Sequence, residues 1–447
     1  MPAKARSGAG EGQVRNGTGG GPHAVQSLTR RTVSLTLVSV VARAPAFLIP
    51  VLIAAVFGAG HETDAYFLAY SAVLFLGGTL AQGIEQAVVP FAAQVIHRAA
   101  APRHYLDRAA VRFVLVSAIC WSLGIPVFLS VANSALRSAI LGYVGTFTPL
   151  ALLWCGAAVF TGALVSQWKI AAATGSMLWR GIGALVGIVA VPLGGGLWGV
   201  ALGLGLGEVG RLWWTRRRLY AGLSESSELL PPPLAPLGRA AAAQVGASAA
   251  IGAAPVIERL LAVSLGVGAV SHLEYALRLL VVPSVVFEGG IIPLVLARWT
   301  QQIAAQNVPP ARRDVLRVVA KGAGLALVIA VLLGVCAPVI VRILLVHGRF
   351  THQDETAVSS LLRMLALAFV ANMGAQLLER HYIASTRNWT LALLQLARAA
   401  LRVGTMWRLL PVVGLTAFAI GFTVADWTYF LALLLCLRAP GSSVTQA

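Results

Sequence analysis

Long apolar stretches separated by short polar segments recur along most of the chain. Stretches such as 113–132, 182–206 and 322–341 reach or exceed the roughly 20 residues that an α-helix needs to cross the core of a bilayer. The pattern predicts an all-α polytopic membrane protein with about twelve transmembrane helices. The expected spans are 32–57, 65–95, 111–132, 146–167, 179–193, 195–212, 241–263, 272–297, 322–345, 356–379, 389–405 and 411–437.

The polar segments divide these spans into two groups of six. Residues 1–30 are rich in glycine and polar side chains and are predicted to form a disordered cytoplasmic tail. The longest polar connection, 215–239, is predicted to be a cytoplasmic linker between an N-terminal six-helix lobe (31–214) and a C-terminal six-helix lobe (240–438). Residues 439–447 are expected to form a second cytoplasmic tail.

Short sequence echoes indicate that the two lobes are repeats. Gly58-Ala-Gly60 followed by Asp64-Ala-Tyr66 is similar to Gly266-Val-Gly268 followed by His272-Leu-Glu274. Further along each half, the segment from Gln167 to Ala172 is similar to the segment from Arg380 to Ser385. Each pair falls on one side of the membrane, which predicts parallel repeats. Transporters often bind substrate between such halves.

Composition and charge support a membrane protein and give its orientation. Hydrophobic residues make up 58% of the chain and charged residues only 11%, so the net charge of +18 is not taken as a sign of nucleic-acid binding. Basic residues gather in alternate loops, which the positive-inside rule assigns to the cytoplasm together with both termini. The basic residues assigned to these loops are Arg98, Arg103, Arg108, Arg112, Lys169, Arg180, Arg211, Arg216, Arg217, Arg218, Arg239, Arg298, Arg312, Arg313, Arg317, Lys321, Arg380 and Arg387.

No motif for catalysis or for a metal or cofactor is present in the sequence. There is no phosphate-binding Gly-rich loop, no HExxH and no nucleophile elbow, so we expect no enzymatic activity and no cofactor. The four cysteines are far apart, within apolar runs, and are predicted to be free thiols: Cys120, Cys155, Cys336 and Cys436.

Charged residues inside the predicted spans are candidates for function because a charge is costly in the bilayer core. Arg43 lies midway along the first span, near the helix-breaking Pro45 and Pro50, and we favour a cavity-facing role over a structural one. Arg278 follows Glu274 by one turn, a spacing that permits an ion pair, so its structural and functional interpretations both stay open.

The two arginines together indicate a kind of ligand. If Arg43 and Arg278 line one cavity, they suit an anion, since the planar guanidinium group binds phosphate through two nitrogens. A phosphate-bearing substrate is therefore a hypothesis from the residues alone. The secondary candidates, each of which could instead form a buried pair or lie near a membrane interface, are Glu85, Glu258, Arg259, Glu274, Glu288 and Arg363.

Several segments resemble the bacterial lipid II flippase family (MurJ, also called MviN) of the multidrug/oligosaccharidyl-lipid/polysaccharide (MOP) exporter superfamily. The stretch from Leu52 to Phe67 is similar to the family's first periplasmic turn, and Ala81 to Pro90 to the end of its second helix. Gly268 to Leu279, with Pro283 and Pro293, resembles the eighth helix, and His347-Gly-Arg-Phe-Thr351 resembles a motif after the ninth.

The resemblance implies roles for three residues. Arg43 and Arg278 match cavity arginines that bind the substrate's pyrophosphate, and Asp64 matches an acidic residue of the first periplasmic turn. Asp64 could equally cap the start of the second span. The chain departs from the family pattern where cavity arginines or an acid would stand, at Ile49, Gly77 or Gly78, and Gln82.

The function implied is translocation of an undecaprenyl-pyrophosphate-linked glycan, such as lipid II, across the bacterial cytoplasmic membrane by alternating access. Three alternatives stay open: flipping of an exopolysaccharide or O-antigen unit, cation-coupled drug export depending on Glu85, and a non-transporting scaffold in wall synthesis. The expected partners are the lipid-linked glycan, membrane lipids and proteins of cell-wall or polysaccharide synthesis.

Overall fold

The structure is a computed structural model that describes residues 22–97, 102–131, 134, 136–221, 223, 233–292, 295, 298–299, 302, 310–385 and 388–437. Within these residues the chain is helical and contains no strand. The N-terminal helices are α1 (Pro22–Phe57), α2 (His61–Val73), η1 (Leu74–Gly78), α3 (Thr79–His97), α4 (Pro102–Val131), α5 (Arg137–Ser166), α6 (Ile170–Gly175), α7 (Met177–Val189), η2 (Val191–Leu193) and α8 (Gly196–Tyr220). The remaining helices are α9 (Ala235–Val263), α10 (Ala269–Val286), η3 (Phe287–Ile291), α12 (Arg312–Leu345), α13 (His352–Ala384), α14 (Asn388–Val413) and α15 (Thr416–Cys436).

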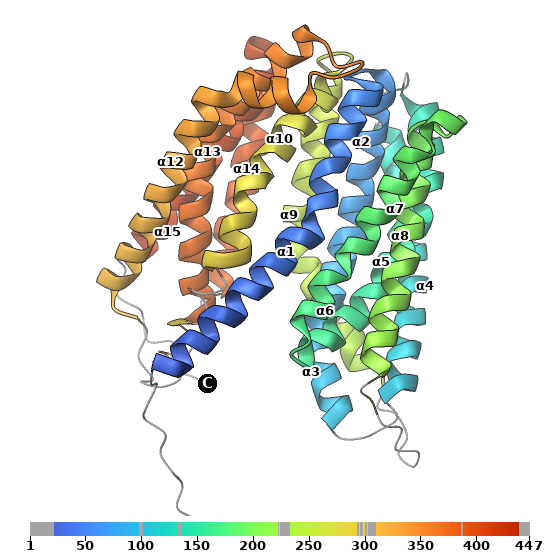
Figure 1. Ribbon diagram of the computed structural model, residues 1–447, viewed down its shortest axis with the longest axis vertical. Coiled ribbons are helices and arrows are strands. Elements are labelled where there is room, and N and C mark those ends of the chain that lie inside the picture. The colour runs from blue at the N-terminus through green and yellow to red at the C-terminus, as the bar shows by residue number, and fades with distance from the viewer. Residues whose placement is uncertain are drawn as a thin grey trace, which may run out of the picture.

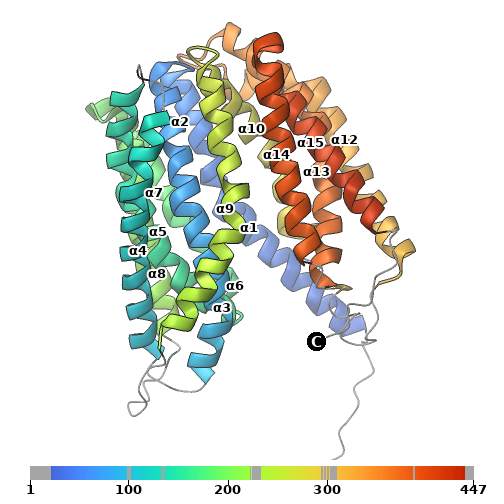
Figure 2. The ribbon, with the colours of Figure 1, turned by 180° about the vertical axis from the view of Figure 1, so that it is seen from behind.

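The long helices fall into two groups by their hydropathy. In the described part of the chain, eight helical segments are long and apolar enough to cross a membrane. The helices α8, α9, α10 and α14 run alongside them and complete the predicted set (Figures 1 and 2). These four carry several buried charged residues, which lower their hydropathy: Glu208, Arg211, Glu258, Arg259 and Glu274.

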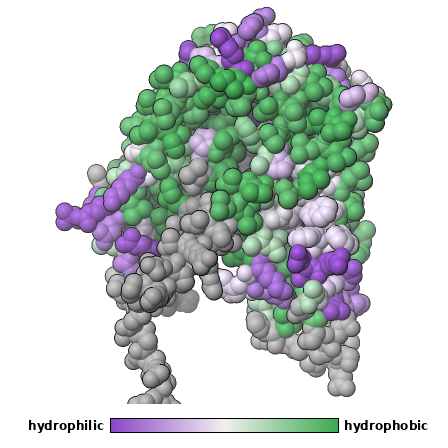
Figure 3. Space-filling view, in the orientation of Figure 1, coloured by the Kyte–Doolittle hydropathy of each residue, from purple (hydrophilic) through white to green (hydrophobic). Residues whose placement is uncertain are grey.

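Apolar side chains cover the outside of the bundle. Leu123 and Val127 of α4 and Val335 and Ile343 of α12 are all more than 60% exposed. Figure 3 shows apolar residues over the middle of one face, with polar residues gathered at its two ends. Exposure of such a large apolar surface to water is unfavourable, whereas the hydrocarbon core of a bilayer can cover it.

Helix packing follows the same plan in the two halves. In the first half α4 packs on α5, α5 on α8 and α7 on α8; in the second half α12 packs on α13, α13 on α15 and α14 on α15. Among the described residues, a π-helical segment stands at the corresponding place of each half, η1 after α2 and η3 after α10. The two-lobe repeat is therefore visible both in the packing order and in a shared local irregularity.

The two halves meet closely at one end of the bundle. We call the end where α1 stops and α2 starts the distal end, and the opposite end, where α15 stops, the proximal end. The ribbons of the halves lie together at the distal end and spread apart toward the proximal end (Figures 1 and 2). The first helix, α1, runs obliquely between them and contacts α6 and α7 of one half and α10, η3 and α12 of the other.

Close packing within the first half depends on glycine. The helices α7 and α8 approach through Gly183 and Gly203, where a Cβ on either residue would lie 2.2 Å from the other's carbonyl oxygen. Any larger residue would force the two helices apart. This contact positions the part of α7 that faces the interior of the bundle.

Helix ends differ from the predicted boundaries. The first helix begins at Pro22, inside the predicted tail 1–30, and residues 1–21 lie outside the described residues. The helix α8 continues to Tyr220 and α9 starts at Ala235, so both ends of the predicted linker 215–239 are helical. The predicted tail 439–447 lies outside the described residues.

Candidate functional site

A pocket of about 200 Å³ lies inside the bundle, lined by α1, α2, α7, α8 and α10. The two arginines singled out in the sequence, Arg43 of α1 and Arg278 of α10, both line it. A third arginine, Arg180 of α7, lines it as well. The rest of the wall is aromatic and apolar and includes Tyr66, Phe67, Tyr70, Ile49, Ile53 and Leu204.

The position of Arg180 differs from the cytoplasmic loop predicted for it. It was assigned to a cytoplasmic loop, but it lies in α7 and its side chain is only 13% exposed. Its guanidinium lies 3.8 Å from the centre of the Trp154 ring, a cation–π contact. Arg211, assigned to the next basic loop, is also helical and fully buried. The signal missed in the sequence was Glu208, an acid in the neighbouring span that could pair with both.

Glu208 joins Arg180 and Arg211 in a buried cluster of the first half. Arg180 Nε donates a hydrogen bond to Glu208 Oε2 at 2.8 Å, and Arg211 Nη1 donates to Glu208 Oε1 at 3.0 Å. Arg211 also donates to the hydroxyls of Ser176 and Thr161. One carboxylate is thus shared by two arginines, of which Arg180 lines the pocket and Arg211 does not.

The second half repeats this arrangement. Glu274 is buried and its Oε1 accepts a hydrogen bond from Arg278 Nε at 2.7 Å, as the one-turn spacing allowed. Its Oε2 accepts hydrogen bonds from Nε and Nη2 of Arg259, which is also buried. Again one carboxylate is shared by two arginines, and Arg278 is the one that lines the pocket.

Arg43 has a partner in the other half of the molecule. Its Nη1 donates a hydrogen bond to Glu288 Oε2 at 2.8 Å, and Glu288 lies in the π-helical segment η3. The two side chains are 44% and 37% exposed, respectively, so the ion pair is open to solvent or ligand. Because α1 and η3 belong to different halves, this ion pair joins the two halves beside the pocket that Arg43 lines.

Other predicted candidates lie away from the pocket. Glu258 is buried and pairs with Arg402 of α14. Glu85 accepts no hydrogen bond among the described residues, but it lies close enough to Arg211 for their charges to interact. Arg363 is exposed on α13 and does not line the pocket.

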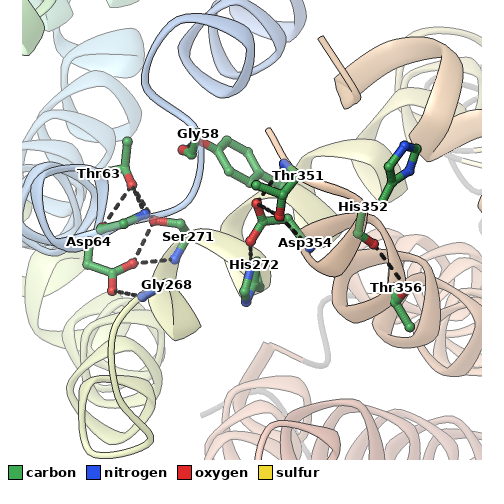
Figure 4. Close-up of polar contacts among 12 residues, drawn as sticks. Gly58, Thr63, Asp64, Gly268, Ser271, His272, Thr351, His352, Asp354 and Thr356 are labelled. Carbon is green, nitrogen blue, oxygen red and sulfur yellow. Dashed lines mark hydrogen bonds and ion pairs between the residues drawn. The ribbon is translucent and has the colours of Figure 1, made fainter. Parts of the chain in front are cut away.

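Asp64 contacts the opposite half of the protein at the distal end (Figure 4). Its carboxylate accepts hydrogen bonds from the backbone N–H groups of Gly268 at 2.6 Å and Ser271 at 2.8 Å, and from the Ser271 hydroxyl at 2.6 Å. Tyr275 OH donates to the carbonyl oxygen of Gly58 at 2.9 Å. We call these contacts the distal clasp; it consists of Gly58, Asp64, Gly268, Ser271 and Tyr275.

The Asp64 side chain does not cap its own helix. Asp64 lies in the first turn of α2, whose N-cap is Gly60, but the Thr63 side chain rather than the Asp64 side chain makes the hydrogen bonds to Gly60. The Asp64 carboxylate instead satisfies N–H groups at the start of α10, where the positive end of the helix dipole favours an anion. Asp64 therefore caps a helix of the other half.

The turn between α12 and α13 closes the distal end further. The backbone N–H of Arg349 donates to the carbonyl oxygen of Ala55 in α1 at 3.0 Å. Gly348 has a φ of +62°, and a Cβ there would lie 2.1 Å from the same oxygen. His272 at the start of α10 and Asp354 of α13 lie 2.7 Å apart. The clasp and the Arg349–Ala55 backbone hydrogen bond hold the two halves together at this end, and the His272–Asp354 contact joins α10 to α13 within the second half.

Solved transporters share this architecture. A lipid II flippase MurJ in an inward closed conformation aligns with 91% of this chain and 88% of its own, with a TM-score of 0.76 and 15% identity. Two conformations of a multidrug resistance MATE family transporter of the MOP superfamily, inward-facing and outward-facing, each cover 92% of this chain, with TM-scores of 0.71 and 0.66 and 15% identity. They cover 97% and 95% of the transporter, respectively.

Sequence comparison gives the family. No curated protein matches the chain. The family model described as Lipid II flippase MurJ matches residues 53–443, which include every described helix except most of α1, the distal clasp and two of the three pocket arginines. With a polytopic helical bundle built from two similar halves around an internal arginine pocket, the chain belongs to the lipid II flippase MurJ family.

Proposed function

We propose that this protein translocates lipid II, an undecaprenyl-pyrophosphate-linked peptidoglycan precursor, across the bacterial cytoplasmic membrane. Membership of the MurJ family supports the substrate and the transport reaction. The described residues present a binding pocket rather than a set of nucleophile, base and oxyanion donors, so we propose transport without catalysis by this chain.

The observation that carries the proposal is the arginine-lined pocket. Arg43, Arg180 and Arg278 reach it from three different helices, and the remaining wall is largely apolar and aromatic. Guanidinium groups bind phosphate oxygens strongly, because the hydrogen bonds are charge-assisted and can form in pairs. A pocket of about 200 Å³ has room for a diphosphate group but not for the whole glycan.

Alternating access fits the arrangement of the two halves. The distal clasp holds the halves together at one end, whereas their ribbons diverge at the other (Figure 1). The basic segments of the chain lie largely at the proximal end, which we assign to the cytoplasm together with both termini. On this assignment the structure is closed toward the outside, and release of the substrate requires the clasp to open.

Transport can be tested in cells that depend on a flippase. A bacterial strain in which the native lipid II flippase can be depleted would express this chain or its Arg43→Ala/Arg278→Ala variant, and lipid II accumulation would be measured. We expect the native sequence to prevent accumulation and the double variant to allow it at equal protein level. Accumulation with both proteins would contradict lipid II transport.

A further inference from the structure

Arg363 of α13 is a charged residue that neither the pocket nor the distal clasp uses. It is exposed, and it forms no hydrogen bond, ion pair or cation–π contact with any described residue. Ser360 is exposed too, and its hydroxyl forms no hydrogen bond within the described part of the chain. Residues three positions apart lie on one face of a helix, so Ser360 and Arg363 form a single polar patch.

The patch lies inside the hydrocarbon layer of the membrane. On the neighbouring helix α12, Lys321 and Arg342 bracket the uncharged stretch 322–341, whose helix rise of about 30 Å matches the thickness of a bilayer core. Arg342 therefore marks the distal boundary of that core, and it pairs with Glu355 of α13 at 3.0 Å. Arg363 follows Glu355 by eight residues, which places its Cα about 12 Å deeper.

The patch faces outward rather than into the bundle. Leu367, one turn after Arg363, is 61% exposed, and its carbonyl oxygen accepts a hydrogen bond from Trp427 Nε1 of α15 at 3.2 Å. Trp427 belongs to the outer face of α15, which also exposes Val424, Leu431 and Leu435. On its other side α13 packs on α12, whose membrane-crossing part exposes apolar side chains as well. The polar patch thus interrupts an otherwise apolar, lipid-facing surface.

The depth of Arg363 limits what can cover it. Lipid tails offer a guanidinium group no hydrogen-bond acceptor, so an unpaired arginine at this depth is unfavourable. The phosphate of a phospholipid lies in the headgroup layer, above Arg363. A second copy of this chain has no suitable acid, because the exposed carboxylates of the described residues, Glu62 and Asp314, lie in the first turns of their helices. A carboxylate on a transmembrane helix of another protein can lie at the required depth.

We infer that the face of α13 between α12 and α15 binds a transmembrane helix of another protein, with Arg363 paired to a carboxylate of that helix in the distal half of the membrane. Ser360 adds a hydroxyl that can donate or accept a hydrogen bond, and its small size lets a second helix approach closely. This surface is separate from the pocket. The inference therefore does not depend on which substrate the protein carries.

The test uses the purified full chain in phosphatidylcholine vesicles and synthetic peptides that cross the bilayer once, each with a leucine-rich core of about 20 residues. One peptide carries a single Glu about 12 Å below one end of its core, a second carries Gln there, and a third carries Glu at the end of the core. Resonance energy transfer between a dye on the peptide and a dye on the protein measures association. The first peptide should bind the unaltered protein about tenfold more tightly than the other two.

Two variants locate the site on the protein. Arg363→Leu, which suits a lipid-facing position, should remove the preference for the Glu peptide over the Gln peptide. Arg408→Leu removes an exposed arginine of α14 that also has no partner within the described residues. It is the matched control and should keep the preference.

Three results would contradict the inference. The Glu and Gln peptides could bind the unaltered protein equally, a comparison that stands even if Arg363→Leu does not fold. The preference could survive in Arg363→Leu. It could also disappear when anionic phosphatidylglycerol is added to the vesicles, in which case a lipid phosphate rather than a helix is the partner of Arg363; persistence of the preference in those vesicles supports the helix.

Discussion

Arg43 of α1 and Glu288 of η3 form an ion pair between the two halves of the molecule, with Nη1 and Oε2 at 2.8 Å. Glu288 is a carboxylate beside a pocket that suits an anion, so it competes with any anionic ligand for Arg43. A phosphate that binds Arg43 would have to displace this carboxylate. The pair therefore offers a link between substrate binding and the contact of the two halves.

Replacing the competing carboxylate should tighten binding. We expect Glu288→Gln to bind undecaprenyl diphosphate several-fold more strongly than the unaltered protein, because Arg43 is released from its ion pair and can bind the ligand. Native mass spectrometry titration measures this directly. The gain should vanish in the Arg43→Ala background, and an equal gain there would mean that Glu288 acts through some other group.

The distal clasp should be sensitive to loss of the Asp64 charge. Asp64→Asn keeps the size of the side chain but weakens three hydrogen bonds to α10, each worth about 1.5–3 kcal/mol when the acceptor is charged. We expect the distal end to open more often and transport to fall at least tenfold. Accessibility of a cysteine at position 70 of the pocket to an impermeant thiol reagent, in a cysteine-free background, reports the opening.

A graded control exists at the same contact. Ser271→Ala removes the hydroxyl donor but leaves the Ser271 backbone N–H bonded to Asp64. Its effect on reagent accessibility should be clearly smaller than that of Asp64→Asn. Equal effects would show that the carboxylate charge is not what closes this end.

The turn at Gly348 makes a second prediction for the distal end. Gly348→Ala places a Cβ 2.1 Å from the Ala55 carbonyl oxygen at a residue with positive φ, so the turn must move away from α1. We expect increased reagent accessibility of the pocket, as for Asp64→Asn. Gly334→Ala in α12, where a Cβ meets no atom within 4 Å, is the matched control and should be silent.

Removing the carboxylate shared in the second half should destabilise the fold. Glu274→Gln leaves Arg259 and Arg278 without their counter-charge in the interior, and breaking a buried pair typically costs about 3–5 kcal/mol. A lower thermal midpoint in detergent is the measurement. Asp314→Asn, which breaks an exposed pair with Arg317, should shift the midpoint by much less; a comparable shift would contradict the argument.

Replacing Glu85 distinguishes a lipid flippase from a cation-coupled drug exporter. It lies outside the pocket and accepts no hydrogen bond among the described residues, so Glu85→Gln should change lipid diphosphate binding by no more than about twofold to threefold. Drug susceptibility of cells expressing the variant should equal that of cells expressing the unaltered protein. Drug resistance that depends on Glu85 would count against the proposed substrate.

The sequence by itself determined the class, the approximate spans and the family. Apolar stretches of membrane-crossing length exclude most folds other than a helix bundle, because backbone polar groups in lipid must form their hydrogen bonds within helices. Local spacing also predicted the Glu274–Arg278 pair, since residues four apart share a helix face. Arg43 was predicted to be a site residue for a different reason, the energetic cost of an isolated charge midway along a membrane span.

Only the tertiary structure decided which charges meet. Arg180 and Glu208 lie on neighbouring helices whose register depends on glycine contacts such as Gly183 with Gly203, and no sequence period records that register. An arginine near a predicted span end is therefore indistinguishable from a loop residue until its helix is placed. Asp64 likewise caps α10 of the other half, a partner fixed by how the two halves dock. Hydropathy is local along the chain, whereas ion pairing depends on packing between distant segments.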